Sequence, residues 1–371
     1  MTRGLGMRRT TIVATALAGM ISMALATGGC GLIGSGDPEA EGATGAPKAA
    51  SPGTPAPSTP AKQPILVAFG GDVHFEGILR PRLASPSTAL GPIARTLRAA
   101  DLAMVNLETA ITTGGTPAPG KQFTFRAPPS AFTALKAAGV DVVSMANNHG
   151  MDYMESGLRD SLRAIKASRF PTVGIGRNAA EAYRPYRVTV KGNRLAIVGA
   201  TQVLDDHLIP AWTATDSKPG LASAKNVERM VQAVRDARQG ADVVIVHLHW
   251  GQELATCPLP RQQDLARRLA EAGADVIVGG HAHVPQGGGY LNDVYVHYGL
   301  GNFVFYSANG PTANSGVLLL RIQDGKVTAD RWRPARISGG LPRLLTGSAG
   351  AAELRRWKSL RGCTGLSARP A

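Results

Sequence analysis

The sequence predicts an α/β fold with much parallel strand pairing, and two observations support this prediction. Runs such as Val243–Val246 and Val276–Val278 are apolar at every position, as expected for strands that are covered on both faces. Helical periodicity appears between such runs, for example at Leu265, Leu269 and Ala272. Strands that alternate with helices are typical of α/β folds, in which neighbouring strands run parallel.

Four of the expected strands begin with the same local pattern. A helix-like segment ends at Gly or Ala, and then a small or apolar residue and Asp lead into an apolar run. Glycine just past a helix suits the left-handed conformation that ends many helices. The four instances are Ala99-Ala100-Asp101-Leu102, Gly139-Val140-Asp141-Val142, Gly240-Ala241-Asp242-Val243 and Gly273-Ala274-Asp275-Val276. Each instance marks the place where a helix ends and the next strand begins.

Residues 1–30 have the layout of a signal peptide. Arg8 and Arg9 precede the apolar stretch Thr11–Ala26, and small residues follow it up to Cys30. The stretch is shorter than the ~20 residues that span a bilayer comfortably. A cysteine in this place resembles a bacterial lipoprotein signal, so we expect Cys30 to become the lipidated first residue of an extracytoplasmic, membrane-anchored protein. An ordinary cleaved signal, which would give a secreted protein, and an uncleaved anchor are the alternatives.

The rest of the chain divides into three segments. Residues 31–63 consist mainly of Pro, Gly, Ala, Ser and Thr, which predicts a disordered tether. Residues 64–337 carry the strand and helix patterns, and we expect them to form one folded domain. Residues 338–371 form a basic C-terminal tail with a short helix candidate, Ala351–Leu360, and no candidate site residue.

A second sheet is expected within the folded domain. Four further runs predict strands with more antiparallel pairing, and the last of them is followed by Asp324-Gly325, a good hairpin turn. The runs are Arg187–Val190, Arg194–Gly199, Val294–Tyr298 and Val317–Ile322.

The formal net charge of +14 indicates an anionic partner. A basic surface can attract nucleic acid, anionic lipid or an anionic polymer. For an exported protein we expect no nucleic acid, and we predict an anionic cell-surface polymer, with the membrane contacted through the lipid anchor. A solvated, membrane-facing surface is the alternative interpretation of this charge.

Beyond Cys30 the sequence contains two cysteines, Cys257 and Cys363. An oxidising compartment would permit a disulfide between them, but their positions in the sequence leave open whether they meet.

Metal-binding residue types gather in five clusters at the ends of apolar runs, and six of the eight histidines lie in these clusters. Histidine is the commonest metal ligand, and carboxylates and amides complete such sites. In α/β sheets ligands bind beyond the carboxyl ends of the strands. The clusters are Asp72-Val73-His74, Asn106-Leu107-Glu108, Asn147-Asn148-His149, His247-Leu248-His249 and His281-Ala282-His283. Together they predict one assembled metal site.

Two of the clusters offer ligand pairs. Asp72 and His74 are two residues apart at a strand end, so their side chains fall on the same side. His281 and His283 have the same spacing and follow Gly279-Gly280, where the backbone can approach a ligand closely. We therefore expect all four side chains to be metal ligands.

The other three clusters supply single ligands. Glu108 offers a carboxylate that is able to bridge two ions, and Asn148 offers an amide oxygen. Of the two histidines that share one strand face, His249 lies nearer the strand end and is the predicted ligand, whereas His247 is assigned to the surroundings of the site or to the core. The seven predicted ligands are about what two metal ions need together with a bridging water.

One histidine remains free for proton transfer. His149 follows Asn148 directly, and Asp152 either orients His149 or lies in the first turn of the next helix, where the helix dipole favours an acid. His207 and His297 lie outside the clusters and are expected to be structural.

These motifs, taken in order, resemble the CapA family of poly-γ-glutamate capsule biosynthesis proteins, which are relatives of the calcineurin-like metallophosphoesterases. The resemblance extends from about Ile65 to Phe305. It implies a four-layer α/β/β/α sandwich of the metallo-dependent phosphatase type with a dinuclear metal centre. It is carried by Gly71-Asp72-x-His74, Asn106-Leu107-Glu108, Ala146-Asn147-Asn148-His149-x-x-Asp152, His249-Trp250-Gly251-x-Glu253, Gly280-His281-x-His283-Val284-x-Gln286 and Leu300-Gly301-Asn302-Phe303-Val304-Phe305. Glu108 stands where metallophosphoesterases usually have a bridging aspartate.

The resemblance implies biosynthesis, export or processing of a poly-γ-glutamate-type capsular or cell-surface polymer, by two-metal hydrolysis or transfer. His149 would donate a proton to the leaving group. Arg126 is a candidate for holding an anionic substrate group, or else packs on Phe125. Mn, Fe and Zn all suit the predicted ligands. A surface metallophosphoesterase and a non-catalytic polymer-binding or tethering protein are the alternative functions.

Overall fold

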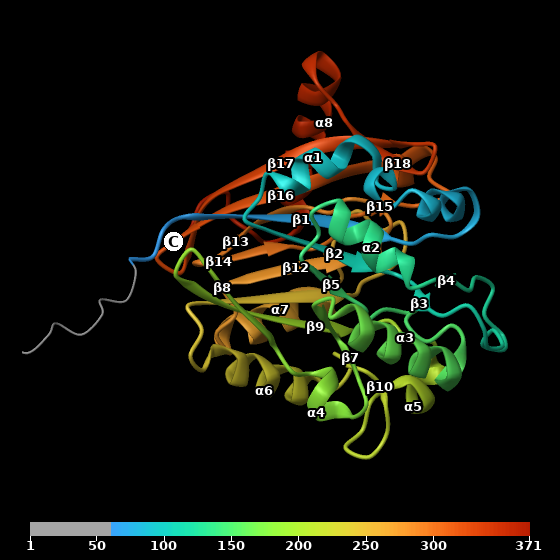
Figure 1. Ribbon diagram of the computed structural model, residues 1–371. Helices are drawn as coiled ribbons and strands as arrows, with labels where there is room; N and C mark the ends of the chain where they lie inside the picture. The colour runs from blue at the N-terminus through green and yellow to red at the C-terminus, as the bar shows by residue number, and fades with distance from the viewer. Residues whose placement is uncertain (1–60) are drawn as a thin grey trace, which may run out of the picture. The chain divides into compact units, whose positions relative to one another are not determined.

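The computed structural model describes residues 61–371, so the predicted signal peptide, Cys30 and most of the predicted tether lie outside the described residues. From residue 61 onward the chain forms two large sheets that face each other, with helices on both outer faces (Figure 1). This arrangement confirms the four-layer α/β/β/α sandwich that the sequence predicted.

The first sheet has the strand order β18-β17-β16-β1-β2-β5-β6, and β15 pairs with the end of β1. β1, β2, β5 and β6 run parallel, whereas β16, β17 and β18 form an antiparallel edge. The predicted turn at Asp324-Gly325 joins β16 to β17. The strands are β1 (Ile65–Val73), β2 (Leu102–Leu107), β5 (Val142–Ser144), β6 (Thr172–Val173), β15 (Asn302–Val304), β16 (Asn314–Gln323), β17 (Lys326–Ser338) and β18 (Leu341–Leu344).

The second sheet has the order β13-β14-β12-β11-β9-β8. The expected antiparallel pairing is only half right, because β9 runs parallel to β11 and β14 parallel to β12. Each is antiparallel only to its hairpin partner at the sheet edge, β8 or β13. The strands are β8 (Tyr186–Val190), β9 (Asn193–Thr201), β11 (Val243–His249), β12 (Val276–Gly280), β13 (Gly288–Leu291) and β14 (Val294–His297); two small ladders pair β3 (Ala110–Ile111) with β4 (Arg126–Ala127) and β7 (Ile175–Gly176) with β10 (Gly220–Leu221).

Apolar residues fill the three spaces between the four layers. Phe69, Met104 and Val278 belong to the core between the two sheets. Helices α1 (Ala94–Arg98), α2 (Ser130–Ala137) and α3 (Met154–Ser168) pack on the first sheet, and α4 (Ala179–Ala182), α6 (Val227–Arg238) and α7 (Pro260–Glu271) pack on the second (Figure 1). The other elements are α5 (Ile209–Trp212), α8 (Gly347–Ser359) and the 3₁₀ turns η1 (Gly77–Ala84), η2 (Pro86–Thr88), η3 (Gly91–Ile93), η4 (Asp206–Leu208), η5 (Gly310–Ala313) and η6 (Leu360–Cys363). Among the helices from residue 61 onward, none has the length and apolarity needed to cross a bilayer.

The aspartates at the strand entries connect neighbouring strands. Asp141 Oδ2 accepts a hydrogen bond from the Ala103 backbone N–H at 2.7 Å, and the Asp141 N–H donates to the Ala103 carbonyl at 2.8 Å. The same two-way contact joins Asp101 to Leu66, Asp242 to Arg194 and Asp275 to Val244. A one-residue slip would turn every apolar side chain of a strand to the wrong face. These contacts therefore fix the register on which the site depends.

The chain after Ile337 is built into the domain, although the sequence set residues 338–371 apart as a tail. β18 continues the first sheet, and the predicted tail helix corresponds to α8. Trp357 of α8 is buried in the core between the sheets, because its ring stacks on His297 and on Trp332. A disulfide also joins Cys257 to Cys363. The sequence analysis set this segment apart because its composition is basic, and it gave no weight to Trp357, the one aromatic residue that anchors it.

His297 is structural, as predicted, since its Nε2 accepts a hydrogen bond from Trp357 Nε1 at 3.1 Å. Burial lowers the pKa of His297 to about 3, whereas in the unfolded chain the imidazole takes up a proton below about pH 6.5. The folded pKa is below the unfolded one, so stability is lost as the pH falls. We expect the free energy of unfolding to fall between pH 7.5 and pH 5 by about 2 kcal/mol less in His297→Phe than in the wild type. Urea unfolding at the two pH values measures this difference.

The control for this prediction is His207→Phe, because His207 is exposed on η4. This variant should show the pH dependence of the wild type. An identical pH dependence in His297→Phe would contradict the assignment.

Candidate metal site

The polar clusters at the strand ends come together at one edge of the two facing sheets. Asp72, Glu108 and Asn148 come from the ends of β1, β2 and β5 in the first sheet. His249, His281 and His283 come from the ends of β11 and β12 in the second sheet. His249 Nε2 lies 2.7 Å from Asn148 Oδ1 and 3.9 Å from Glu108 Oε1, so the site straddles both sheets.

Glu108 lies at the centre of the cluster. Its Oε1 atom is buried and has no hydrogen-bond partner among residues 61–371. This atom lies 3.8 Å from His149 Nε2, 3.9 Å from His249 Nε2 and 4.0 Å from His283 Nε2. These separations are too long for hydrogen bonds, but they suit ligands that share an ion at about 2.0–2.2 Å from each. The Glu108 side chain therefore fits a divalent cation.

The charge balance of the site points the same way. Burial, together with nearby Asp72, raises the pKa of Glu108 well above its usual value. Burial also raises the pKa of Asp72. One oxygen or nitrogen from each of Asp72, Glu108 and His283 lies within 4.8 Å of the other two. Two buried carboxylates this close are costly unless a cation joins them.

Neutral imidazoles complete the ligand set. Burial, followed by the neighbouring histidines, lowers the pKa of His249 well below its usual value and that of His281 to about 3. Both rings are therefore neutral, which is the form that binds metals. His281 and His283 also have positive φ angles of 87° and 55°. A non-glycine residue in this region costs about 1–3 kcal/mol, and such strain is concentrated at binding sites.

Asn106 holds the two carboxylates in place. Its Nδ2 donates to Asp72 Oδ1 at 2.8 Å and to Glu108 Oε2 at 3.4 Å. Its Oδ1 accepts from Asn147 Nδ2 at 3.0 Å. The sequence placed Asn106 beside Glu108 but gave it no role, because the role depends on contacts across three strands.

Asn302 fixes the ring of His283. Its Oδ1 lies 2.7 Å from His283 Nδ1, and its Nδ2 donates to the Thr312 carbonyl. The amide oxygen therefore accepts a hydrogen bond from Nδ1–H, and the His283 Nε2 lone pair faces Glu108. Asn302 was present in the motifs around residue 300, but the sequence analysis did not select it as a site residue.

Loss of the Asn302 side chain should weaken metal binding although no ligand is removed. Loss of such a supporting hydrogen bond typically lowers affinity 10- to 100-fold, and we expect about this effect for Asn302→Ala when the protein is titrated with Mn²⁺ or Zn²⁺. The control is Asn314→Ala, which removes a hydrogen bond to Arg336 at the surface. Equal affinities for the two variants would show that His283 needs no such support.

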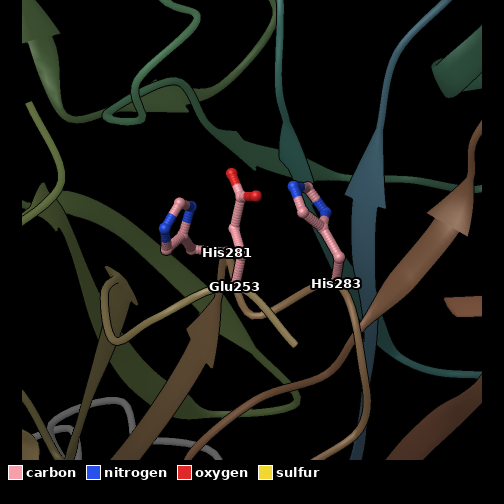
Figure 2. A group of neighbouring side chains, drawn as sticks. All are labelled: Glu253, His281 and His283. Carbon is pink, nitrogen blue, oxygen red and sulfur yellow. The ribbon is translucent and has the colours of Figure 1, made fainter. Parts of the chain in front are cut away.

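Glu253 is an additional candidate ligand that the sequence analysis did not select. One ligand atom from each of Glu253, His281 and His283 lies within 4.8 Å of the others, and Figure 2 shows the Glu253 carboxylate between the two imidazoles. Glu253 is exposed in the loop after β11. The signal was available, because Glu253 follows His249-Trp250-Gly251 in the motif.

Asp152 fixes the ring of His149, which the sequence analysis assigned to proton transfer. Its Nδ1 lies 2.5 Å from Asp152 Oδ2, and its ring stacks on Phe125 with the centroids 4.1 Å apart. Burial lowers the pKa of His149, whereas the hydrogen bond to Asp152 raises it. The neutral ring therefore donates from Nδ1 to Asp152, and its Nε2 lies toward Glu108. Lys121, which the sequence analysis missed, lies 2.7 Å from Asp152 Oδ1 and comes from a distant loop.

The structure does not bring His74 into the ligand group, although the sequence predicted it there. Its Nδ1 lies 3.0 Å from the Glu76 amide and its Nε2 lies 3.2 Å from the Tyr306 amide. The ring packs between Phe125 and Phe305. The chain turns after β1, so the alternation that would place His74 beside Asp72 ends there.

Two other predicted residues lie at the margin of the site. The guanidinium of Arg126 lies over the ring of Tyr153, 4.8 Å from its centroid, and not on Phe125 as the alternative had it. His247 is buried, and neither ring nitrogen has a hydrogen-bond partner within the described part of the chain. Burial lowers the pKa of His247 to about 4, in keeping with its assignment to the core.

The chain is similar in sequence to proteins with known names. Residues 66–307 match the family described as bacterial capsule synthesis protein PGA_cap. The chain is 34% identical over 216 residues to the capsule biosynthesis protein CapA of Bacillus anthracis, covering 57% of this chain and 52% of that protein. It is 32% identical over 213 residues to a probable polyglutamine synthesis accessory protein of Mycobacterium tuberculosis, covering 56% of each. The chain thus spans about half the length of the curated relatives it matches.

Solved structures of similar shape include a putative 5′-nucleotidase from Staphylococcus aureus, with a TM-score of 0.47, 16% identity and coverage of 81% of this chain and 58% of that chain. A hypothetical protein from Thermus thermophilus has a TM-score of 0.47, 19% identity and coverage of 74% and 100%. The family match contains both ligand groups and runs from β1 to beyond β15. The chain therefore belongs to the PGA_cap family of bacterial capsule synthesis proteins.

Proposed function

We propose that this protein takes part in the biosynthesis, export or processing of a poly-γ-glutamate-type anionic surface polymer, through metal-dependent hydrolysis or transfer. The observation that carries the catalytic part is the buried, unpaired Oε1 of Glu108, which faces three imidazole nitrogens. Membership of the capsule synthesis family supports the polymer class.

The donor atoms fit two divalent ions, and Mn, Fe and Zn all accept this mixture of nitrogen and oxygen. Asp72, Glu108 and His283 form one candidate group, and Glu253 and His281 form the other, with His283 close enough to serve either ion but only one at a time. His249 and Asn148 lie beside the first group. When bound, such ions would polarise the scissile group and stabilise developing negative charge.

The side chains around the ions would transfer a proton, balance charge and hold the substrate. Asp152 orients His149 and stabilises its protonated form, so that Nε2 can take up the proton released by the attacking water and pass it to the leaving group. Lys121 offsets the charge of Asp152. Burial of these groups excludes water and strengthens their interactions. Arg126 would hold an anionic group of the substrate at the margin of the site.

We also propose that the protein is extracytoplasmic and anchored in the membrane through lipidated Cys30, with residues 31–63 as the tether. The order of charged, apolar and small residues before Cys30 supports this proposal. The Cys257–Cys363 disulfide also suits an oxidising compartment. Membrane fractionation tests it, because Cys30→Ser should move the protein to the soluble fraction.

The catalytic part is tested with purified protein after its metal has been restored. Elemental analysis should find two ions per chain, and polymer length should fall or change in a metal-dependent assay on poly-γ-glutamate. His149→Ala should abolish this activity, whereas the exposed His207→Ala should retain it. A metal-loaded protein that acts on neither γ-glutamyl nor phosphoester substrates would refute catalysis and favour a polymer-binding or tethering role.

A surface metallophosphoesterase is the second candidate function. The mixture of carboxylate, amide and imidazole donors favours it, because this set suits ions that clamp both oxygens of a phosphoryl displacement. A panel of phosphomonoesters and phosphodiesters, run beside the polymer assay, separates the two candidates.

A further inference from the structure

Two adjoining hollows lie between β17, β18, the η3–α1 segment and the start of α8. The first, of about 520 Å³, is lined by Arg95, Arg333 and Arg343. The second, of about 380 Å³, is lined by Arg331, Arg333 and the start of α8. Arg333 and Leu344 line both hollows, so the two adjoin each other, and together they are called the groove. None of the residues that line it belongs to either ligand group of the metal site.

The positive charge of this groove has no partner within the described residues. Arg95, Arg331, Arg333 and Arg343 take part in none of the side-chain hydrogen bonds or ion pairs found between residues 61 and 371, and no acidic residue lines either hollow. Several other surface arginines, in contrast, are paired with acidic side chains. Arg194, for example, pairs with Asp242 at 2.7 Å.

The local sequence adds to this imbalance. Residues 331–371 contain nine Lys and Arg but a single acidic residue, Glu353, which pairs with Arg356. Arg336 and Arg343 also lie directly opposite each other on β17 and β18. Like charges in this position destabilise a sheet. Arg336 donates to Asn314 and lines neither hollow, so a bound anion would relieve this repulsion through Arg343.

The start of α8 adds a second kind of anion-binding group. Gly347 is the first residue of this 13-residue helix and lines the groove. The side chain of Thr346, at the N-cap, makes no capping hydrogen bond. The first backbone N–H groups of α8 therefore remain available, and the helix dipole places partial positive charge there.

We propose that this groove binds a segment of a polymer that carries carboxylates at regular intervals. The four arginines occupy two consecutive hollows, which suits a chain of charges better than a single small anion. Pro92 and Leu344 provide apolar surface between the cations, against which the methylene groups of such a chain can pack. The identity of the polymer rests on the proposed function, but the groove is separate from the metal site, so binding and chemistry can be tested apart.

The test is binding of a fluorescent γ-linked glutamate oligomer of about 20 residues to the full chain, followed by anisotropy. In the variant Arg95→Gln/Arg333→Gln/Arg343→Gln, we expect the affinity to fall roughly tenfold or more. The matched control, Arg159→Gln/Arg235→Gln/Arg267→Gln, removes the same charge from exposed positions on α3, α6 and α7. We expect the affinity of the control variant for the oligomer to fall less than about twofold. Thermal melts of both variants verify that they fold.

Equal losses in the two triple variants would overturn the proposal, because only long-range attraction would then be involved. A second arm uses vesicles of phosphatidylglycerol in phosphatidylcholine. Loss of vesicle binding with unchanged oligomer binding in the groove variant would identify a lipid site and also overturn the proposal. Glu108→Gln separates this idea from the proposed function: the oligomer should still bind to this variant, even if the wild type proves to have no polymer-cleaving activity.

Discussion

Reduction of the Cys257–Cys363 disulfide should lower the free energy of unfolding by about 4–5 kcal/mol. The two cysteines are 106 residues apart in sequence. A cross-link that closes a loop of about 100 residues removes entropy from the unfolded chain worth roughly 4.7 kcal/mol at 25 °C. Urea unfolding with and without a reductant that reaches the disulfide measures this difference.

The double variant Cys257→Ser/Cys363→Ser serves as the control. Its stability should match that of the reduced wild type and should not respond to the reductant. A wild-type protein that loses less than about 1 kcal/mol on full reduction would show that packing of Trp357 and its neighbours alone holds the C-terminal segment in place.

Substitution of Glu108 by Gln should change metal affinity and metal-free stability in opposite directions. The variant lacks the carboxylate at the centre of the candidate metal site, so we expect affinity to fall by more than the roughly 100-fold that loss of a supporting group produces. Without metal, the variant should be more stable than the wild type by about 1–3 kcal/mol, because an amide replaces a buried carboxylate. Isothermal titration and urea unfolding in chelator measure the two effects.

The sign of the second effect follows from the raised pKa of Glu108. Because its pKa is higher in the folded than in the unfolded protein, the metal-free wild type loses stability as the pH rises from about 4.5 toward the folded value. Glu108→Gln should lack this loss. Glu271→Gln, at an exposed position on α7, is the control and should match the wild type in both measurements. A Glu108→Gln variant that is less stable in chelator would refute the cation interpretation.

The fold was predictable wherever one local signal decided the outcome. Fully apolar runs such as Val243–Val246 became buried strands, and the glycines before Asp141, Asp242 and Asp275 have positive φ. Pairing direction was less predictable, because β9 and β14 each have one parallel and one antiparallel neighbour. The C-terminal segment was not predictable, since its place depends on Trp357 and on a disulfide to a loop 106 residues away.

The site was predictable where ligand types follow strands directly, as with Glu108 and His249. Asn106 and Asn302 were missed as supports because an amide shows its role only through its partners on other strands. Lys121 was missed because a flexible lysine in a loop has no periodic signal that connects it to Asp152. The position of His74 could not be predicted because alternation ends with the strand.

Because the candidate metal site lies across both sheets, substitutions in the core between the sheets should affect it. Glu108 moves with one sheet and His249 with the other, and an apolar layer that includes Phe69 and Val278 sets their separation. Ligand geometry tolerates errors of only about 0.5 Å. A volume change in that layer should therefore alter ion affinity without touching a ligand, so packing deep in the core bears on metal binding as well as on stability.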